Sequence, residues 1–156
     1  RKPVLVAGGI GIPPMLELAK TIKRQYPDMK VTAVLGYRDS NTFLLDDLKK
    51  YADVIIATDD GSLGVHGNVI DAIKKENIEA GVFYACGPMP MLKGLKSYAE
   101  ERGIEAQISL EEKMACGIGA CLACVCKTKN IDEHSHVNNA RICKDGPVFD
   151  SREVEL

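Results

Sequence analysis

Four cysteines lie in the short segment 114–126, and their spacing is that of a metal site rather than of core packing. Cys116, Cys121 and Cys124 follow the pattern C-x4-C-x2-C, and Cys143 follows downstream. This is the plant-type pattern of a [2Fe–2S] cluster, whose two irons take four thiolate ligands. We therefore expect these four cysteines to be the metal ligands.

Small residues occupy the positions between the expected ligands, among them Gly117, Gly119, Ala120 and Ala123. Glycine reaches positive φ and has no Cβ, so the backbone N–H groups of such a loop can approach the cluster sulfurs and tune the reduction potential. Cys126 breaks the ligand spacing, and we expect it to be a buried bystander.

Three other uses of these cysteines have to be weighed. A structural zinc site usually has two C-x2-C pairs, and only one occurs here. A disulfide framework needs an oxidising compartment, which nothing in the chain signals. A Rieske centre would use two histidines, such as His134 and His136, in place of two cysteines; we expect both to be solvated loop residues. Zinc remains the main alternative at this point.

Apolar runs alternate with helical patterns through the first part of the chain. This alternation predicts an α/β fold, with a five-stranded, doubly wound parallel sheet covered on both faces. The alternation of strand and helix patterns ends after Leu110, so we expect two domains, 1–110 and 111–156. The second domain is too small for a large core, and we expect the cluster to hold it together. The expected strands are 4–7, 31–37, 54–58, 82–86 and 105–110, and the expected helices cover 16–22, 44–51, 69–75 and 89–102.

Composition excludes several partners. The 156 residues carry a net charge of -2, and the cations are scattered, so we expect neither a nucleic acid nor an anionic membrane as partner. No apolar run is long enough for a membrane span and no leader precedes a cleavage site, which makes the cytoplasm the expected location. The chain starts at Arg1 without an initiator methionine, so we expect a piece of a longer protein.

A glycine turn, Gly8-Gly9-Ile10-Gly11-Ile12-Pro13-Pro14, follows the first expected strand. Backbone N–H groups and the dipole of the following helix can hold a pyrophosphate there. The turn departs from G-x-G-x-x-G, since Pro14 takes the third glycine position counted from Gly9; proline is tolerated in a first helical turn. The alternative is an ordinary βα turn.

The ends of the next three expected strands carry polar or reactive residues. At the end of the second strand, an acidic residue is typical of NAD-binding proteins and an arginine of NADP-binding ones. Arg38 and Asp39 are adjacent there, so this rule does not decide between NAD and NADP. Asp59 and Asp60 end the third strand on the expected ligand side of the sheet, although a solvated turn explains them equally well. Cys86 ends the fourth strand and is expected to face the same crevice; taken alone, it fits a structural cysteine.

Two motifs together resemble a known family. The segment Gly8–Pro13 with Cys86-Gly87-Pro88 resembles the nucleotide-binding half of the ferredoxin–NADP reductase superfamily. The resemblance implies that Gly8, Gly9, Gly11 and Ile12 line the pyrophosphate. It also implies that Cys86, Gly87, Pro88 and Met89 border the nicotinamide.

The segment Ser109–Met114, the cysteine loop and the segment Cys143–Phe149 narrow the resemblance further. They resemble the electron-transfer subunits of NAD-linked, two-subunit bacterial dihydroorotate dehydrogenases, over essentially the whole chain. The resemblance implies an oxidoreductase component of pyrimidine biosynthesis that moves electrons between NAD(H), FAD and a [2Fe–2S] cluster. The cluster would then exchange electrons with FMN in a catalytic partner that interconverts dihydroorotate and orotate.

One departure from the family concerns the flavin. Family members carry an N-terminal FAD-binding β-barrel, and no such segment occurs in these residues, so FAD is expected in the intact protein.

Two alternative functions stay open. One is an NAD(P)H:ferredoxin or sulfur-reducing subunit of the same superfamily, and the other is a zinc-stabilised binding module without redox activity.

Overall fold

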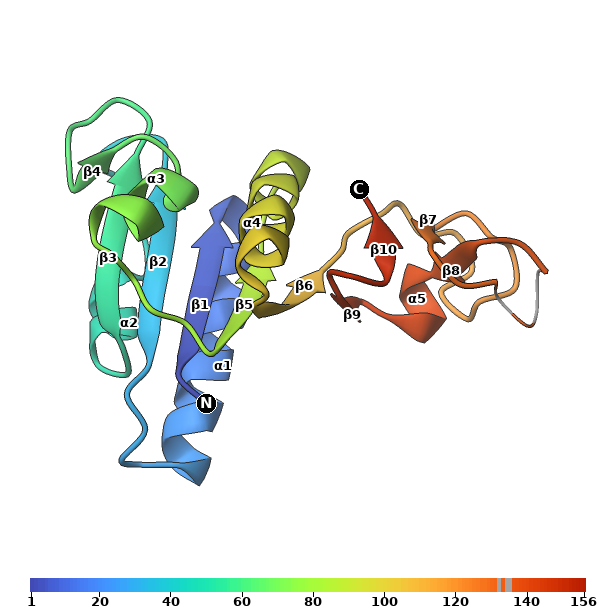
Figure 1. Cartoon of the computed structure of the whole chain (residues 1–156), viewed down its shortest axis with the longest axis horizontal. Coiled ribbons are helices and arrows are strands. Elements are labelled where there is room, and N and C mark those ends of the chain that lie inside the picture. Colours follow the sequence, from blue (N-terminus) through green and yellow to red (C-terminus); the bar gives the residue numbers. More distant parts are fainter. Residues whose placement is uncertain (132, 134–135) are drawn as a thin grey trace.

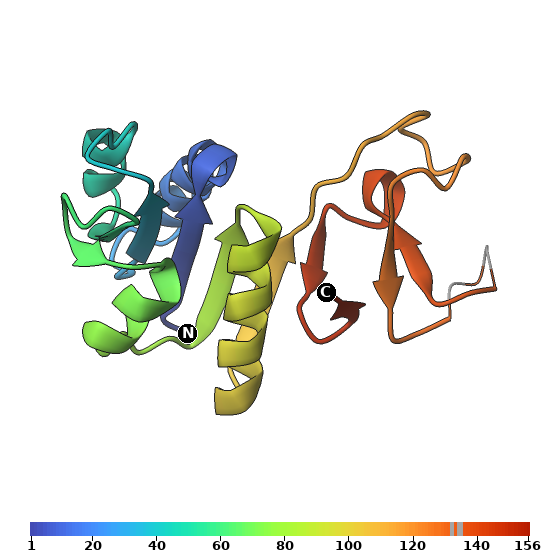
Figure 2. The same ribbon diagram turned by 90° about the horizontal axis from the view of Figure 1, so that it is seen from above.

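The computed structural model describes residues 1–131, 133 and 136–156. A doubly wound α/β part and a smaller, β-rich C-terminal part lie side by side and meet at strands β6 (Glu105–Ser109) and β9 (Val148–Asp150) (Figures 1 and 2). His134 lies outside the described residues. His136 is exposed, with a φ of 57°.

Five parallel strands form the centre of the main sheet, in the order β3-β2-β1-β5-β6. Most residues of β1, β2 and β5 are buried, which is why these segments are apolar runs rather than alternating patterns. The doubly wound parallel core is therefore confirmed. The bounds are Pro3–Gly8 (β1), Thr32–Tyr37 (β2), Asp53–Thr58 (β3), Val82–Cys86 (β5) and Glu105–Ser109 (β6).

The sheet has two more strands than the sequence predicted, so its full order is β4-β3-β2-β1-β5-β6-β9. The two-residue strand β4 (Val65–His66) extends the parallel edge beside β3, and it is too short to leave a pattern in the sequence. Strand β9 (Val148–Asp150) pairs antiparallel with β6. It comes from beyond the cysteine loop, so residues after 110 return to complete the main sheet.

Helices cover both faces of the sheet (Figure 1). Helices α1 (Ile12–Gln25) and α2 (Leu45–Lys49) pack over one face with Leu5 and Leu35, and α3 (Val69–Lys75) and α4 (Met89–Arg102) cover the other with Val6 and Phe83. Each fully buried leucine or phenylalanine contributes about 1.5–3 kcal/mol to these layers. Helix α2 begins one residue later than the predicted 44–51, because Leu44 has a left-handed backbone with φ 60°, and it ends at Lys49.

The C-terminal part has a three-stranded antiparallel sheet in the order β10-β7-β8. Its elements are β7 (Val125–Thr128), β8 (Asn139–Arg141), the short helix α5 (Ile142–Asp145) and β10 (Val154–Glu155). Cys124, Ile142 and Val154 belong to the same buried cluster as Phe83 and Leu95, so one core continues from the main sheet into this part. Within the described residues, no helix is both long and apolar enough to cross a bilayer.

Candidate functional site

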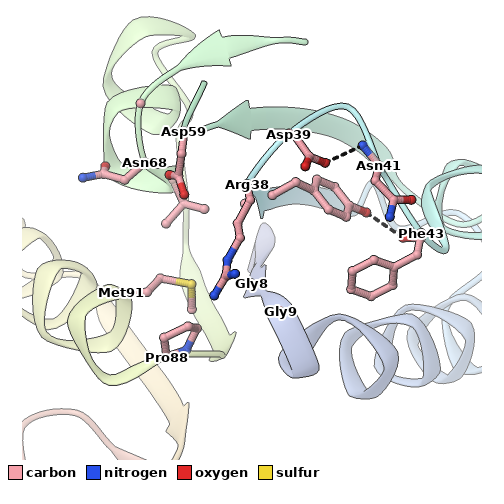
Figure 3. A pocket seen from close by; sticks show the side chains of 14 residues that line it. Gly8, Gly9, Arg38, Asp39, Asn41, Phe43, Asp59, Asn68, Pro88 and Met91 are labelled. Carbon is pink, nitrogen blue, oxygen red and sulfur yellow. Dashed lines mark hydrogen bonds between the residues drawn. The ribbon is translucent and has the colours of Figure 1, made fainter. Parts of the chain in front are cut away.

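A pocket of about 500 Å³ opens at the carboxyl ends of β1, β2 and β3, between the glycine turn and the start of α4 (Figure 3). Ligands of open parallel sheets bind at this edge, where the strand order reverses. The pocket is lined by six of the residues that the sequence singled out: Gly8, Gly9, Arg38, Asp39, Asp59 and Pro88.

The glycine turn is shaped by close backbone contact. A Cβ at Gly11 would lie 1.8 Å from the carbonyl oxygen of Cys86, so only glycine lets the β1 and β5 loops come together. Gly9 has a φ of 55°, a left-handed conformation that glycine adopts without strain. The buried residue Ile12 then starts α1, so the turn presents Gly8 and Gly9 to the pocket while Gly11 packs beneath it.

Arg38 and Asp59 extend into the pocket from the ends of β2 and β3 (Figure 3). Their neighbour Asp39 is turned to its own loop, where its carboxylate accepts a hydrogen bond from the N–H of Asn41 at 2.8 Å. The hydroxyl of Tyr37 donates to the carbonyl of Phe43 at 2.8 Å, and burial raises the pKa of Tyr37 to about 12. The pocket is therefore lined by one cation, Arg38, and by two carboxylates, of which that of Asp39 is already hydrogen-bonded within its own loop.

The other predicted nucleotide residues lie near the pocket without lining it. Asp60 sits in a turn in which Ser62 donates to its carboxylate at 2.9 Å, and these side-chain and backbone hydrogen bonds from Ser62 lower its pKa. Cys86 is buried at the end of β5, where desolvation raises the pKa of its thiol. Gly87 and Met89 flank Pro88 at the start of α4.

Sequence reasoning missed several residues that line the pocket, including Phe43, Asn68 and Met91. The position of Asn68 could have been predicted from a helix-capping pattern in the sequence. Its side chain accepts from the N–H of Asp71 and the Asp71 carboxylate accepts from the N–H of Asn68, a capping pair three residues apart that marks the start of α3. The other two become neighbours only through the fold.

The cysteine loop wraps its backbone around one sulfur. The N–H groups of Ile118 and Ala120 donate to Sγ of Cys116 at 3.4 and 3.3 Å. Together with the N–H of Cys121, these hydrogen bonds lower the pKa of Cys116 to about 6, so its thiolate is favoured near neutral pH. Gly117 and Gly119 have φ values of 71° and 83°, which allow the turn.

The fourth cysteine is brought to the loop by α5. The N–H of Cys143 donates to Sγ of Cys124 at 3.3 Å, and the N–H of Ile142 donates to the carbonyl of Cys124 at 2.9 Å. A side-chain hydrogen bond with the free thiol of Cys124 raises the pKa of Cys143. The structure thus brings Cys143 to the loop, although the spacing of the other three cysteines does not specify its position.

Side-chain hydrogen bonds link Cys116 with Cys121 and Cys124 with Cys143, and the charge of Cys116 also acts on Cys143. In the described part of the chain, no three His, Cys, Asp or Glu side chains converge on one point that could hold a single metal ion. Cys126, on β7, is half-buried, and desolvation raises the pKa of its thiol. Met114, Ile118 and Leu122 project from the loop, and Ile118 is 74% exposed.

A doubly wound sheet with a glycine turn, followed by a cysteine loop, is the arrangement of a nucleotide-binding domain joined to a cysteine-rich metal-binding domain. Residues 5–97 match the oxidoreductase NAD-binding domain family, and residues 111–155 match the iron-sulfur cluster binding domain of dihydroorotate dehydrogenase B. The first match spans more than half of the chain, so the chain belongs to the oxidoreductase NAD-binding domain family. Over nearly its whole length it is also similar to dihydroorotate dehydrogenase B (NAD(+)) electron transfer subunits.

Two relatives illustrate the similarity. The electron transfer subunit from Fusobacterium nucleatum subsp. nucleatum is 44% identical over 158 residues, covering 98% of this chain and 57% of that protein. The one from Caldanaerobacter subterraneus subsp. tengcongensis is 42% identical over 154 residues, covering 99% of this chain and 59% of that protein. The chain therefore spans less than two thirds of the length of these relatives.

Solved structures show the same fold. The structure of an NADH-dependent reduced ferredoxin–NADP oxidoreductase matches 97% of this chain and 53% of its own, with a TM-score of 0.82 and 30% identity. A flavohemoglobin from Malassezia yamatoensis matches 65% of this chain and 28% of its own, with a TM-score of 0.51 and 22% identity. The second similarity concerns the fold alone.

Proposed function

We propose that this chain is the nucleotide-binding and cluster-binding portion of an electron-transfer subunit. In this proposal the intact protein passes electrons between NAD(H), FAD and a [2Fe–2S] cluster, and the cluster exchanges them with the FMN of a dihydroorotate dehydrogenase partner. Hydride chemistry moves two electrons and an iron–sulfur centre takes one, so a flavin has to stand between them. The carrying observation is the fusion, through β9 and a shared core, of a nucleotide pocket and paired cysteines.

The pairing of the thiols supports a cluster with two irons. Each iron of a [2Fe–2S] cluster takes two thiolates, with the inorganic sulfides bridging the metals, whereas a structural zinc ion needs four ligands around one point. The pairs Cys116–Cys121 and Cys124–Cys143 match the first requirement. The N–H groups directed at Cys116 and Cys124 would hold these ligands as thiolates once the cluster is bound.

The pocket residues suggest how a dinucleotide binds. Gly8 and Gly9 would let the pyrophosphate approach the backbone at the start of α1, and Arg38 would neutralise its charge. Asp59 would accept hydrogen bonds from a ribose diol and repel a 2′-phosphate, which favours NAD over NADP. The segment 86–89 would border the nicotinamide. These roles complete the proposed division into a nucleotide-binding domain, 1–110, and a cluster domain, 111–156.

The exposed loop suggests where a partner docks. Met114, Ile118 and Leu122 form an apolar rim beside the two exposed ligands Cys116 and Cys121, so a partner that covers the rim would bring its own redox group close to the cluster. FAD belongs to the intact protein in this proposal. The proposed location is the cytoplasm, where thiols stay reduced and remain available as cluster ligands.

Metal analysis with a visible spectrum tests the cluster directly. We expect about two irons and two acid-labile sulfides per chain and a brown colour that bleaches on reduction. A colourless protein that holds zinc after anaerobic purification would instead support the non-redox binding module. The activity is tested by co-expressing the intact subunit with its dehydrogenase partner and measuring NAD reduction by dihydroorotate.

A second function is favoured by one observation. The 30% identical structural relative is an NADH-dependent reduced ferredoxin–NADP oxidoreductase, so ferredoxin is a candidate electron partner in place of a dehydrogenase. Turnover with ferredoxin but not with dihydroorotate would support this alternative.

A further inference from the structure

Arg141 is a buried cation in the C-terminal part of the chain, at the end of β8. Only 5% of the residue is exposed. A guanidinium in such a position is costly unless it is paired and hydrogen-bonded. The Asp145 carboxylate accepts from Nε at 3.1 Å and from Nη2 at 3.3 Å, and it also accepts from the backbone N–H of Arg141 at 2.8 Å. Asp145 thus holds the guanidinium in a fixed orientation.

The same guanidinium reaches the cysteine loop. Nη1 of Arg141 donates a buried hydrogen bond of 3.1 Å to the carbonyl oxygen of Gly119. This carbonyl belongs to the peptide unit whose N–H is that of Ala120, and the Ala120 N–H donates to Sγ of Cys116 at 3.3 Å. Arg141 and the sulfur of Cys116, an expected ligand, are therefore hydrogen-bonded to opposite ends of one peptide group.

Peptide geometry makes this arrangement a positioning device. In a planar trans peptide the C=O and N–H bonds point in opposite directions, so fixing the oxygen also fixes the direction of the N–H. A cationic donor on the oxygen polarises the peptide and strengthens the N–H as a donor. Gly119 is also confined from the other side, because a Cβ there would meet the Lys144 side chain at 2.7 Å.

We propose that Arg141 is a positioning residue for the cluster, which acts through the peptide between Gly119 and Ala120 on the sulfur of Cys116. Hydrogen bonds to ligand sulfurs stabilise the more negative, reduced state of a cluster and so raise its potential. Arg141 also joins the loop that carries three ligands to the helix that carries Cys143. The inference rests on the proposed [2Fe–2S] cluster and adds to it a residue that sets its potential.

The test compares Arg141→Gln, Arg141→Lys and a control, Arg152→Gln, in the purified protein with its cluster. Arg152 is an exposed arginine that pairs with Asp150 in the turn after β9. Iron content, the electron paramagnetic resonance spectrum of the reduced cluster and the midpoint potential are measured for each. The iron content of the unmodified protein tests the cluster assignment separately, so its failure is not confused with failure of the role of Arg141.

We expect Arg141→Gln to lower the midpoint potential and change the resonance anisotropy, Arg141→Lys to give an intermediate shift because it keeps one charged donor, and Arg152→Gln to match the unmodified protein. Cluster loss in Arg141→Gln with a native circular dichroism spectrum, restored in Arg141→Lys, also supports the proposal. Full iron content with an unchanged potential and spectrum overturns it. Unfolding of residues 111–156 in both variants overturns it too, since Arg141 would then serve only the fold.

Discussion

The backbone N–H of Cys143 lies 3.3 Å from Sγ of Cys124 and donates to it, although the two residues come from separate segments. The contact is made by α5, whose Ile142 N–H also bonds to the Cys124 carbonyl. Because Ile142 and Cys124 are both buried in the shared core, the protein chain itself orders one pair of expected ligands. The other pair, Cys116 and Cys121, is exposed on the loop.

The exposed pair gives a first prediction. Cys121→Ser should remove one ligand of the outer pair and abolish the visible absorption of a reconstituted sample, because a hydroxyl is a poor substitute for a thiolate on iron. The α/β part should keep its circular dichroism, since its core does not include Cys121. Cys126→Ser is the matched control and should retain iron and sulfide. Unchanged iron and sulfide in Cys121→Ser would contradict the ligand assignment.

The nucleotide pocket gives a second prediction. Asp59→Asn should weaken NADH binding by roughly ten- to hundredfold, since a hydrogen bond to a charged group is worth about 1.5–3 kcal/mol. It should also reduce the ratio of NADH affinity to NADPH affinity. Calorimetric titration of both nucleotides measures the change. Asp60→Asn is the control and should bind as the unmodified protein does, because Asp60 lies outside the pocket. Equal losses in the two variants would argue against a specific role for Asp59.

The glycine turn gives a third prediction, on stability. Gly11→Ala would place a Cβ against the Cys86 carbonyl, and the backbone shift should cost at least about 1–3 kcal/mol in urea unfolding. Gly94→Ala, in α4, is the matched control. Its Cβ would lie 3.5 Å from Ile70, an ordinary contact, and alanine should stabilise the helix by about 0.5–1 kcal/mol. A neutral Gly11→Ala would mean that the close approach is not required.

The turn after β9 gives a fourth prediction, on acid stability. The hydrogen bonds and charge of Arg152 lower the pKa of Asp150 in the folded protein. A carboxyl group whose pKa is lower in the folded than in the unfolded state stabilises the protein at pH values above its unfolded pKa of about 3.9. This stabilisation is lost as the pH falls through the pKa of the folded state. The stability difference between the unmodified protein and Asp150→Asn should therefore shrink below about pH 4. A difference that stays constant from pH 7 to pH 3 would contradict this role.

Much of the fold could be predicted because its signals are local. Continuous apolar runs such as Val4–Ala7 and Val82–Cys86 indicate strands that are buried on both faces, and the glycine turn between the first strand and α1 is readable from glycine and proline alone. The doubly wound core follows from their alternation with helices. The cysteine spacing likewise predicts a metal loop, because three of the four expected ligands lie on one short segment.

Contacts between residues far apart in the chain were decided only by the tertiary structure. No sequence pattern predicts that β9 pairs with β6 or that Arg141 donates to the carbonyl of Gly119. Nor does any pattern predict that Asp59 lines the pocket while Asp60 lies in a separate turn. Residue type and spacing constrain the backbone over a few positions. Pairing across tens of residues is selected by the burial and hydrogen bonding of the whole fold, so it becomes visible only there.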